Sequence, residues 1–128
     1  MSDAIIPVSR SLFLCESYTG HPDGRIDLAG VFTTIRPAIY PHVRQRLAMF
    51  VQLSGGQGET SLFFEIRRER DDELIRTTAV RTIRFGDRVS PFNVAIVIEG
   101  VRFTEPGVYA VSLFCNNRWV CDTALILV

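Results

Sequence analysis

The chain of 128 residues contains no lysine, so all fourteen of its basic residues are arginines. This absence excludes Schiff-base chemistry, a lysine general base and the lysine of a phosphate-binding loop. Arginine does not replace lysine as a base, because its guanidinium stays protonated at neutral pH. Fourteen acidic residues balance the arginines, and a chain without net charge is not expected to bind nucleic acid.

Histidine and cysteine are also scarce, with two and three residues respectively. No C-x-x-C or H-x-x-x-H pattern occurs, so no metal site is predicted. The glycine-rich segment 55–58 lacks the lysine and the strand-to-helix context of a phosphate loop. His21 and His42 each lie beside a proline in predicted loops. We therefore expect no cofactor, no catalytic residue and a non-enzymatic protein.

The cysteines are odd in number, and each lies within an apolar predicted strand. Such cysteines predict free thiols in a reducing cytoplasm rather than a disulfide framework. Long hydrophobic runs are absent too, since the apolar cluster at residues 12–15 is far too short to span a membrane. We expect a cytoplasmic protein without a membrane partner.

What the chain does contain is short apolar segments with alternating polarity. Their spacing predicts about eight strands, and no segment keeps a helical period for three turns. The predicted strands cover residues 9–18, 25–35, 46–53, 60–68, 74–85 and 92–103, followed by the two strands of a C-terminal hairpin. Residues 36–45 are long enough to connect two sheets. We predict a single all-β domain over residues 1–128, a two-sheet antiparallel β-sandwich of immunoglobulin-like or jelly-roll-like type, with a closed barrel as the alternative.

The closing hairpin, over residues 103–128, gives the clearest signal. Asn116 and Asn117 separate two apolar runs, and asparagine tolerates the positive φ that a type I′ turn requires at both central positions. The resulting register opposes 115 to 118, 113 to 120, 111 to 122 and 109 to 124. It places Cys115 and Cys121 on opposite faces, and it predicts a core face formed by Tyr109, Val111, Leu113, Cys115, Val120, Ala124 and Ile126.

The other face of this hairpin places Phe114 directly opposite Trp119. The pair has two interpretations, ordinary cross-strand stabilisation or an exposed patch for self-association or a protein partner. Our first hypothesis is an interaction or structural module whose partner is unknown, with a homodimer as one form. The alternative hypothesis is a small-ligand-binding sandwich that uses loops 19–24 and 36–45, with His21, Tyr40 and His42 lining the site.

Two charged segments have plainer interpretations. The run at residues 67–73 alternates in sign and is typical of a solvated hairpin end. Within the long predicted strand 74–85, Arg76 and Arg84 share one face and Arg81 lies on the other. These arginines therefore form no continuous basic stripe.

Four short motifs point to a known group of proteins. They are Leu14-Cys15-Glu16, Gly30-Val31-Phe32, Phe103 with Gly107-Val108-Tyr109, and Leu125-Ile126-Leu127-Val128. In these motifs the chain resembles an uncharacterised bacterial family of small single-domain all-β proteins of unknown function, over nearly its whole length. The resemblance implies an all-β domain and assigns no site residue.

Overall fold

A computed structural model describes residues 4–128 of the chain, and for Arg10 it describes the backbone alone. Within these residues the secondary structure consists of strands without a helix. None of the described segments is therefore a helix that could cross a membrane. The strands are β1 (Val8–Gly20), β2 (Ile26–Phe32), β3 (Thr34–Ile35), β4 (His42–Ser54), β5 (Gly58–Arg68), β6 (Glu73–Thr77), β7 (Arg81–Phe85), β8 (Phe92–Phe103), β9 (Gly107–Cys115) and β10 (Arg118–Leu127).

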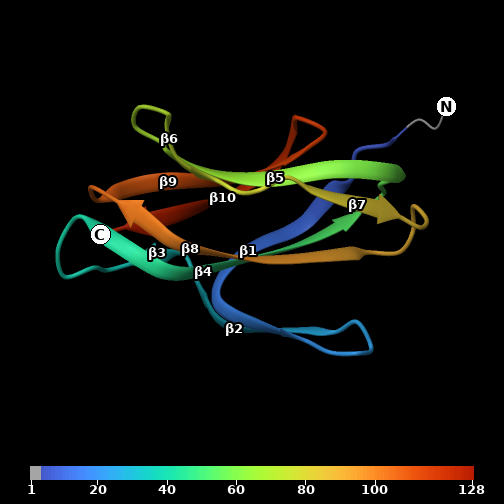
Figure 1. The fold of residues 1–128 in the computed structure, drawn as a ribbon, viewed down its shortest axis with the longest axis horizontal. Helices are drawn as coiled ribbons and strands as arrows, with labels where there is room; N and C mark the ends of the chain where they lie inside the picture. The colour runs from blue at the N-terminus through green and yellow to red at the C-terminus, as the bar shows by residue number, and fades with distance from the viewer. Residues whose placement is uncertain (1–3) are drawn as a thin grey trace.

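The strands form two sheets, as predicted. The smaller sheet has the order β2-β1-β4-β8, and the larger has the order β3-β10-β9-β5-β6, with β7 also paired to β5. Figure 1 shows the larger sheet lying over the smaller one. The predicted sheet-to-sheet link is confirmed, because β3 belongs to the larger sheet and β4 to the smaller. It is shorter than expected, since β4 already begins at His42.

The number of strands and the direction of one pairing differ from the prediction. The described chain has ten strands rather than eight, because the predicted strands 25–35 and 74–85 are each divided. The second division has a local cause: the backbone of Phe64 hydrogen-bonds the N–H and the hydroxyl of Thr78, between β6 and β7. The sheets are also not wholly antiparallel, since β3 pairs in parallel with β10.

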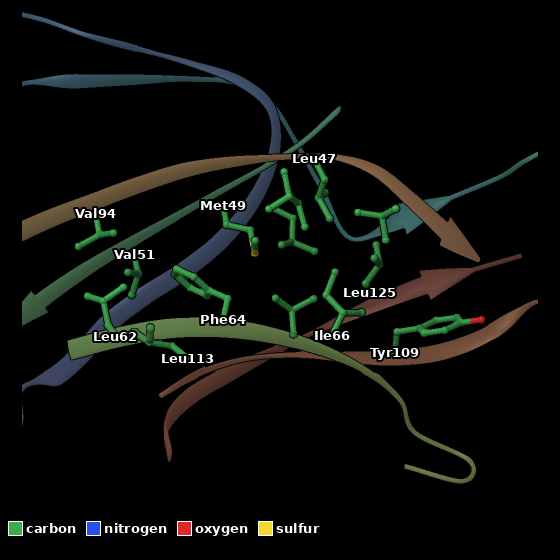
Figure 2. Packing of buried hydrophobic residues seen from close by; sticks show 14 of the residues in the cluster. Leu47, Met49, Val51, Leu62, Phe64, Ile66, Val94, Tyr109, Leu113 and Leu125 are labelled. Atoms are coloured by element: carbon green, nitrogen blue, oxygen red, sulfur yellow. The ribbon is translucent and has the colours of Figure 1, made fainter. Parts of the chain in front are cut away.

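The core lies between the facing sheets (Figure 2). Fully burying one such aliphatic or aromatic side chain contributes about 1.5–3 kcal/mol. The largest contributions come from β4, β5, β8 and β9, whose buried side chains include Leu47, Met49, Val51, Leu53, Leu62, Phe64, Ile66, Val101, Phe103, Tyr109, Val111 and Leu113.

The closing hairpin forms with the predicted turn but not with the whole predicted register. Cys115 faces Arg118 and Phe114 faces Trp119, as expected, and a bulge then shifts the pairing between Trp119 and Cys121. Beyond this bulge every side chain of β10 lies on the opposite face from the one predicted. The buried residues are therefore Leu125 and Leu127, whereas Ala124 and Ile126 are exposed.

The same bulge corrects the placement of the cysteines. Cys121 pairs with Leu113, so it faces the core on the same side as Cys115. The prediction of opposite faces was wrong because an inserted residue reverses the alternation. Both thiols are free, as is that of Cys15.

Candidate functional site

An aromatic row crosses the outer face of the larger sheet. It consists of Phe63 on β5, Phe114 on β9 and Trp119 on β10, which are neighbours in the ladder from one strand to the next. The rings of Phe63 and Phe114 stack with centroids 5.2 Å apart and planes inclined by 9°. The Trp119 side of the row is open, since this residue is 58% exposed. The row is thus a contiguous aromatic surface that the chain itself covers only in part.

The hairpin tip holds the row in place. Asn116 and Asn117 have φ values of 50° and 62°, which confirms the predicted positive φ at both turn positions. Asn116 accepts a hydrogen bond from the Ser61 N–H through its side chain and donates its own N–H to the Ser61 carbonyl. These two bonds tie the turn to β5, beside Phe63. The aromatic row therefore lies on a rigid part of the sheet.

The aromatic row is one end of a longer outer face. At the other end, Val108 pairs with Ile126, and these residues are 40% and 37% exposed. Ala110 and Ala124 lie between the two ends and are also paired. The face between the apolar ends also carries charge, because Asp122 pairs with Ser112 and the Glu65–Arg67 ion pair of β5 lies beside these residues.

Sequence reasoning found Phe114 and Trp119 but missed Phe63. Its signal was present, because Leu62, Phe64 and Ile66 occupy the buried positions of β5 and an aromatic residue between them must point outward. The cross-strand position of Phe63 could not be read from the sequence, because it depends on the pairing of β5 with β9, which are distant in the chain.

The three residues predicted to line a ligand site do not come together. His21 bonds Asp27, with 2.6 Å between Nε2 and Oδ2, beside a shallow depression of about 400 Å³ that extends to Pro91 and Phe92. The hydroxyl of Tyr40 donates to the Val128 carbonyl at 3.1 Å, so it anchors the C-terminal strand.

His42 lies elsewhere again, and in a strand rather than in the predicted loop. It pairs with Phe103 at the start of β4 and borders a second depression, formed with Glu16, Arg44 and Arg46. Its Nε2 is buried and has no hydrogen-bond partner within residues 4–128. Among the described residues neither histidine belongs to a group of three or more His, Cys, Asp or Glu side chains that could hold a metal ion.

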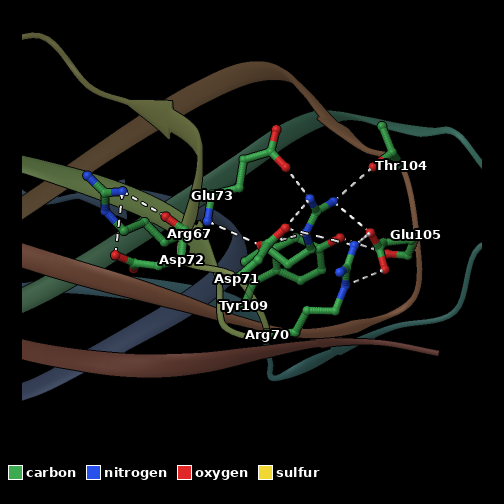
Figure 3. A network of polar contacts seen from close by, with 9 residues as sticks. Arg67, Arg70, Asp71, Asp72, Glu73, Thr104, Glu105 and Tyr109 are labelled. Carbon is green, nitrogen blue, oxygen red and sulfur yellow. Dashed lines mark hydrogen bonds and ion pairs between the residues drawn. The ribbon is translucent and has the colours of Figure 1, made fainter.

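The charged run 67–73 lies at the β5–β6 hairpin end with residues 69–73 exposed, as predicted, and in addition forms a network of ion pairs around the buried Arg68 (Figure 3). The Arg68 side chain is only 9% exposed and forms ion pairs with Asp71, Glu73 and Glu105. Arg70 also binds Glu105, at 2.6 Å. The network joins the β5–β6 turn to the β8–β9 turn, and a distant partner such as Glu105 is invisible to local charge patterning. We interpret it as structural, because each central charge is already neutralised.

The network also sets the ionisation of its members. Hydrogen bonding to Arg68 lowers the pKa of Asp71 to about 2, and the bond to Arg70 lowers the pKa of Glu105. At the end of the network the Tyr109 hydroxyl donates to the Glu105 carbonyl at 2.7 Å. Burial raises the pKa of this tyrosine.

The cysteine thiols are poor candidates for nucleophiles. Burial, and then the neighbouring Cys121, raises the pKa of Cys115 to about 11. Burial also raises the pKa values of Cys15 and Cys121. All three are thus protonated at neutral pH, whereas a reactive cysteine needs its thiolate form.

Two facing sheets around one core, with a partly uncovered aromatic face, define a small all-β protein. The chain belongs to the family of unknown function DUF6941, whose family model matches residues 10–128. A search of curated proteins found no match to the chain. The predicted membership in a family of unknown function is therefore confirmed.

Proposed function

We propose that this protein is a non-enzymatic interaction module and that its binding surface is the outer face of β5, β9 and β10. The observation that carries the proposal is the row of Phe63, Phe114 and Trp119. Aromatic side chains left partly exposed on a rigid sheet favour association, because they bury a large area at a small cost in side-chain entropy.

The occupant that fits this face best is a second copy of the chain. In a two-fold dimer the same face is used twice, so the aromatic row of one copy packs over Val108 and Ile126 of the other. Face-to-face packing of this kind leaves the core of each copy unchanged.

Native mass measurement at micromolar concentration tests the proposal. Wild-type protein is expected as a dimer of the 14.4 kDa chain, and Trp119→Asp as a monomer, because a carboxylate buried in the interface lacks a partner. Val89→Asp is the matched control, since Val89 is 87% exposed in the loop before β8. If the wild-type protein is only monomeric and Trp119→Asp does not change its oligomeric state, the homodimer is contradicted.

Within the same proposal we assign the chain to one domain, a β-sandwich of immunoglobulin-like rather than jelly-roll-like type. The bond from the Tyr109 hydroxyl to the Glu105 carbonyl, four residues upstream, supports this choice. It has the form of the tyrosine corner, which occurs in immunoglobulin-like sandwiches where a strand follows a crossover turn. The step from β8 to β9 is such a crossover, because the two strands belong to different sheets.

The proposal also retains a bacterial source and a cytoplasmic location. The first rests on the motifs quoted for the resemblance, and the second is supported by three free thiols in one small chain. We favour interaction over small-ligand binding because His21 and His42 border different depressions and the Tyr40 hydroxyl is already bonded to the Val128 carbonyl.

A further inference from the structure

A second surface, independent of the aromatic row, lies along the edge of the smaller sheet. Within the described chain β8 pairs with β4 alone, so its other edge is free. A free edge offers unpaired N–H and C=O groups, to which another strand can be added. Proteins usually block such an edge against the addition of another strand. A part of the edge that is left open is therefore a candidate binding site.

One end of this edge is blocked by Arg76. Its Nη2 donates to the carbonyls of Glu99 at 2.9 Å and Gly100 at 3.0 Å. The Glu99 carbonyl therefore points away from β4. The register of β8 against β4 is the same from Phe92 to Phe103, and only Gly100, which has a positive φ of 66°, has no partner in the ladder.

Groups that face one edge recur at every second residue of a regular antiparallel strand. Because Glu99 faces the free edge, the N–H and C=O of Val97 and Ala95 face it as well. No arginine caps these groups in the described chain. The segment 95–97 is thus the open part of the edge.

A groove of about 340 Å³ runs beside this open segment. One wall is formed by Ile96, Val97 and Ile98, and the other by residues 76–81 of the larger sheet. Val80, at 66% exposed, contributes an apolar surface to the second wall. The groove thus combines unpaired backbone with an apolar floor, which are the two requirements for binding an extended peptide.

The charge of the groove is positive. Arg76 and Arg81 pair with the buried residues Ile66 and Leu62, so both arginines point toward the gap between the sheets. The predicted placement of Arg76 with Arg84 and opposite Arg81 was wrong, because the strand breaks between β6 and β7. Arg81 is exposed, its guanidinium has no hydrogen-bond or ion-pair partner among residues 4–128, and no acidic residue lines the described groove.

We propose that the free edge of β8 at residues 95–97 binds an extended acidic peptide, which adds as a fifth strand to the smaller sheet and pairs a carboxylate with Arg81. A second copy of the chain fits less well, because the Arg76 and Arg81 of that copy would approach the same two arginines of the first. The acidic character of the peptide follows from the arginines, and its extended conformation follows from the free edge. The proposal does not depend on self-association through Trp119.

A displayed library of random short peptides, selected on the wild-type protein, provides the probes. Enriched peptides are expected to carry Asp or Glu and to be rich in β-branched residues. Each is then synthesised in two forms that are N-methylated at alternate amides. In an added strand only alternate N–H groups face β8. Methylation of these groups should weaken binding about tenfold or more, whereas methylation of the others should leave the affinity of the parent peptide unchanged.

Two variants of the protein test the same contacts without any change to the peptide. Val97→Pro removes an outward N–H that the ladder to β4 does not use, and proline is tolerated at such edge positions. Arg81→Glu reverses the charge, and Arg84→Glu is its control, because Arg84 pairs with Glu59 on the other face of the sheet. We expect both groove variants to weaken binding by about tenfold or more and the control to leave it unchanged.

Several results would overturn the inference. Failure to enrich any peptide, enrichment of basic peptides, or equal binding by both N-methylated forms would each exclude an acidic fifth strand. The N-methylation result uses unaltered protein, so it holds even where Val97→Pro does not fold. Trp119→Asp should bind the peptides as the wild type does, which separates this site from the proposed dimer face.

Discussion

Gly30 lies against Glu16, so two of the sequence motifs, Leu14-Cys15-Glu16 and Gly30-Val31-Phe32, are in contact. Its φ is +66°, and a Cβ built on it would lie 2.9 Å from the Glu16 side chain. Cys15 pairs with Val31 in the same ladder, so the two motifs are adjacent in space. Glycine within a strand often marks a bulge or a close approach, and at Gly30 the structure contains a close approach. The identity of the approaching residue required the β1–β2 register.

We therefore predict that Gly30→Ala lowers the free energy of unfolding by about 1–2 kcal/mol, the usual cost of a left-handed conformation for a residue with a Cβ. Gly20→Ala is the control, because that position has open space around it and no positive φ. Urea denaturation gives both values. Equal stabilities for the two variants would contradict a strained position 30.

Asp71 gives a prediction about acid stability. Its pKa is about 2 in the folded protein against an ordinary value of 3.8. A carboxyl with a lowered folded pKa stabilises the protein fully above its unfolded pKa, and this contribution is lost as the pH falls through the folded pKa. Wild-type protein should thus lose part of its stability between about pH 4 and pH 2.

Asp71→Asn is expected to melt at a lower temperature than the wild type at pH 7 and to lose less stability on acidification, since the titrating group is gone. Thermal denaturation at several pH values measures both effects. Asp72→Asn is the matched control, because Asp72 is 84% exposed and lies 4.0 Å from its partner Arg67. Identical pH profiles for the two variants would show that Arg68 does not hold Asp71 as described.

At the scale of the element, only the first part of β10 could be predicted from the sequence. The turn residues and the first two pairs were predicted correctly, because turn chemistry is local. The bulge near Val120 was not predicted, since nothing in the alternation marks it and the packing of Leu125 and Leu127 on the core decides it. The division between β6 and β7 was missed for a similar reason, as it depends on the bond between Thr78 and a distant strand.

The bulge predicts an unusual response to deletion. Removing Val120 should leave a regular ladder in which Cys121 and all later residues of β10 keep their faces, so the protein still folds. Removing Thr123 should turn Leu125 and Leu127 toward solvent and abolish folding. Circular dichroism and thermal denaturation of the two deletions distinguish these outcomes. Loss of folding in both would contradict a bulge at this position.

At the scale of the whole molecule, composition and alternation were sufficient for the fold class and the existence of two sheets. They could not give the parallel pairing of β3 with β10 or the position of Phe63, because these depend on contacts between distant segments. The same holds for the free edge of β8. The positions of the two proposed binding surfaces thus depend on how distant strands pair. The sequence gives the residue types on these surfaces but not which of them lie side by side.

The central claim is that the outer face of the larger sheet is covered by a second copy of the chain. Trp119 is the only tryptophan and lies in that face, so its fluorescence reports directly on its burial. The decisive measurement is the emission maximum during dilution from high to low micromolar concentration. We predict a shift to longer wavelength as the dimer dissociates and Trp119 meets water, whereas Trp119 emission typical of full solvent exposure at every concentration would contradict the account.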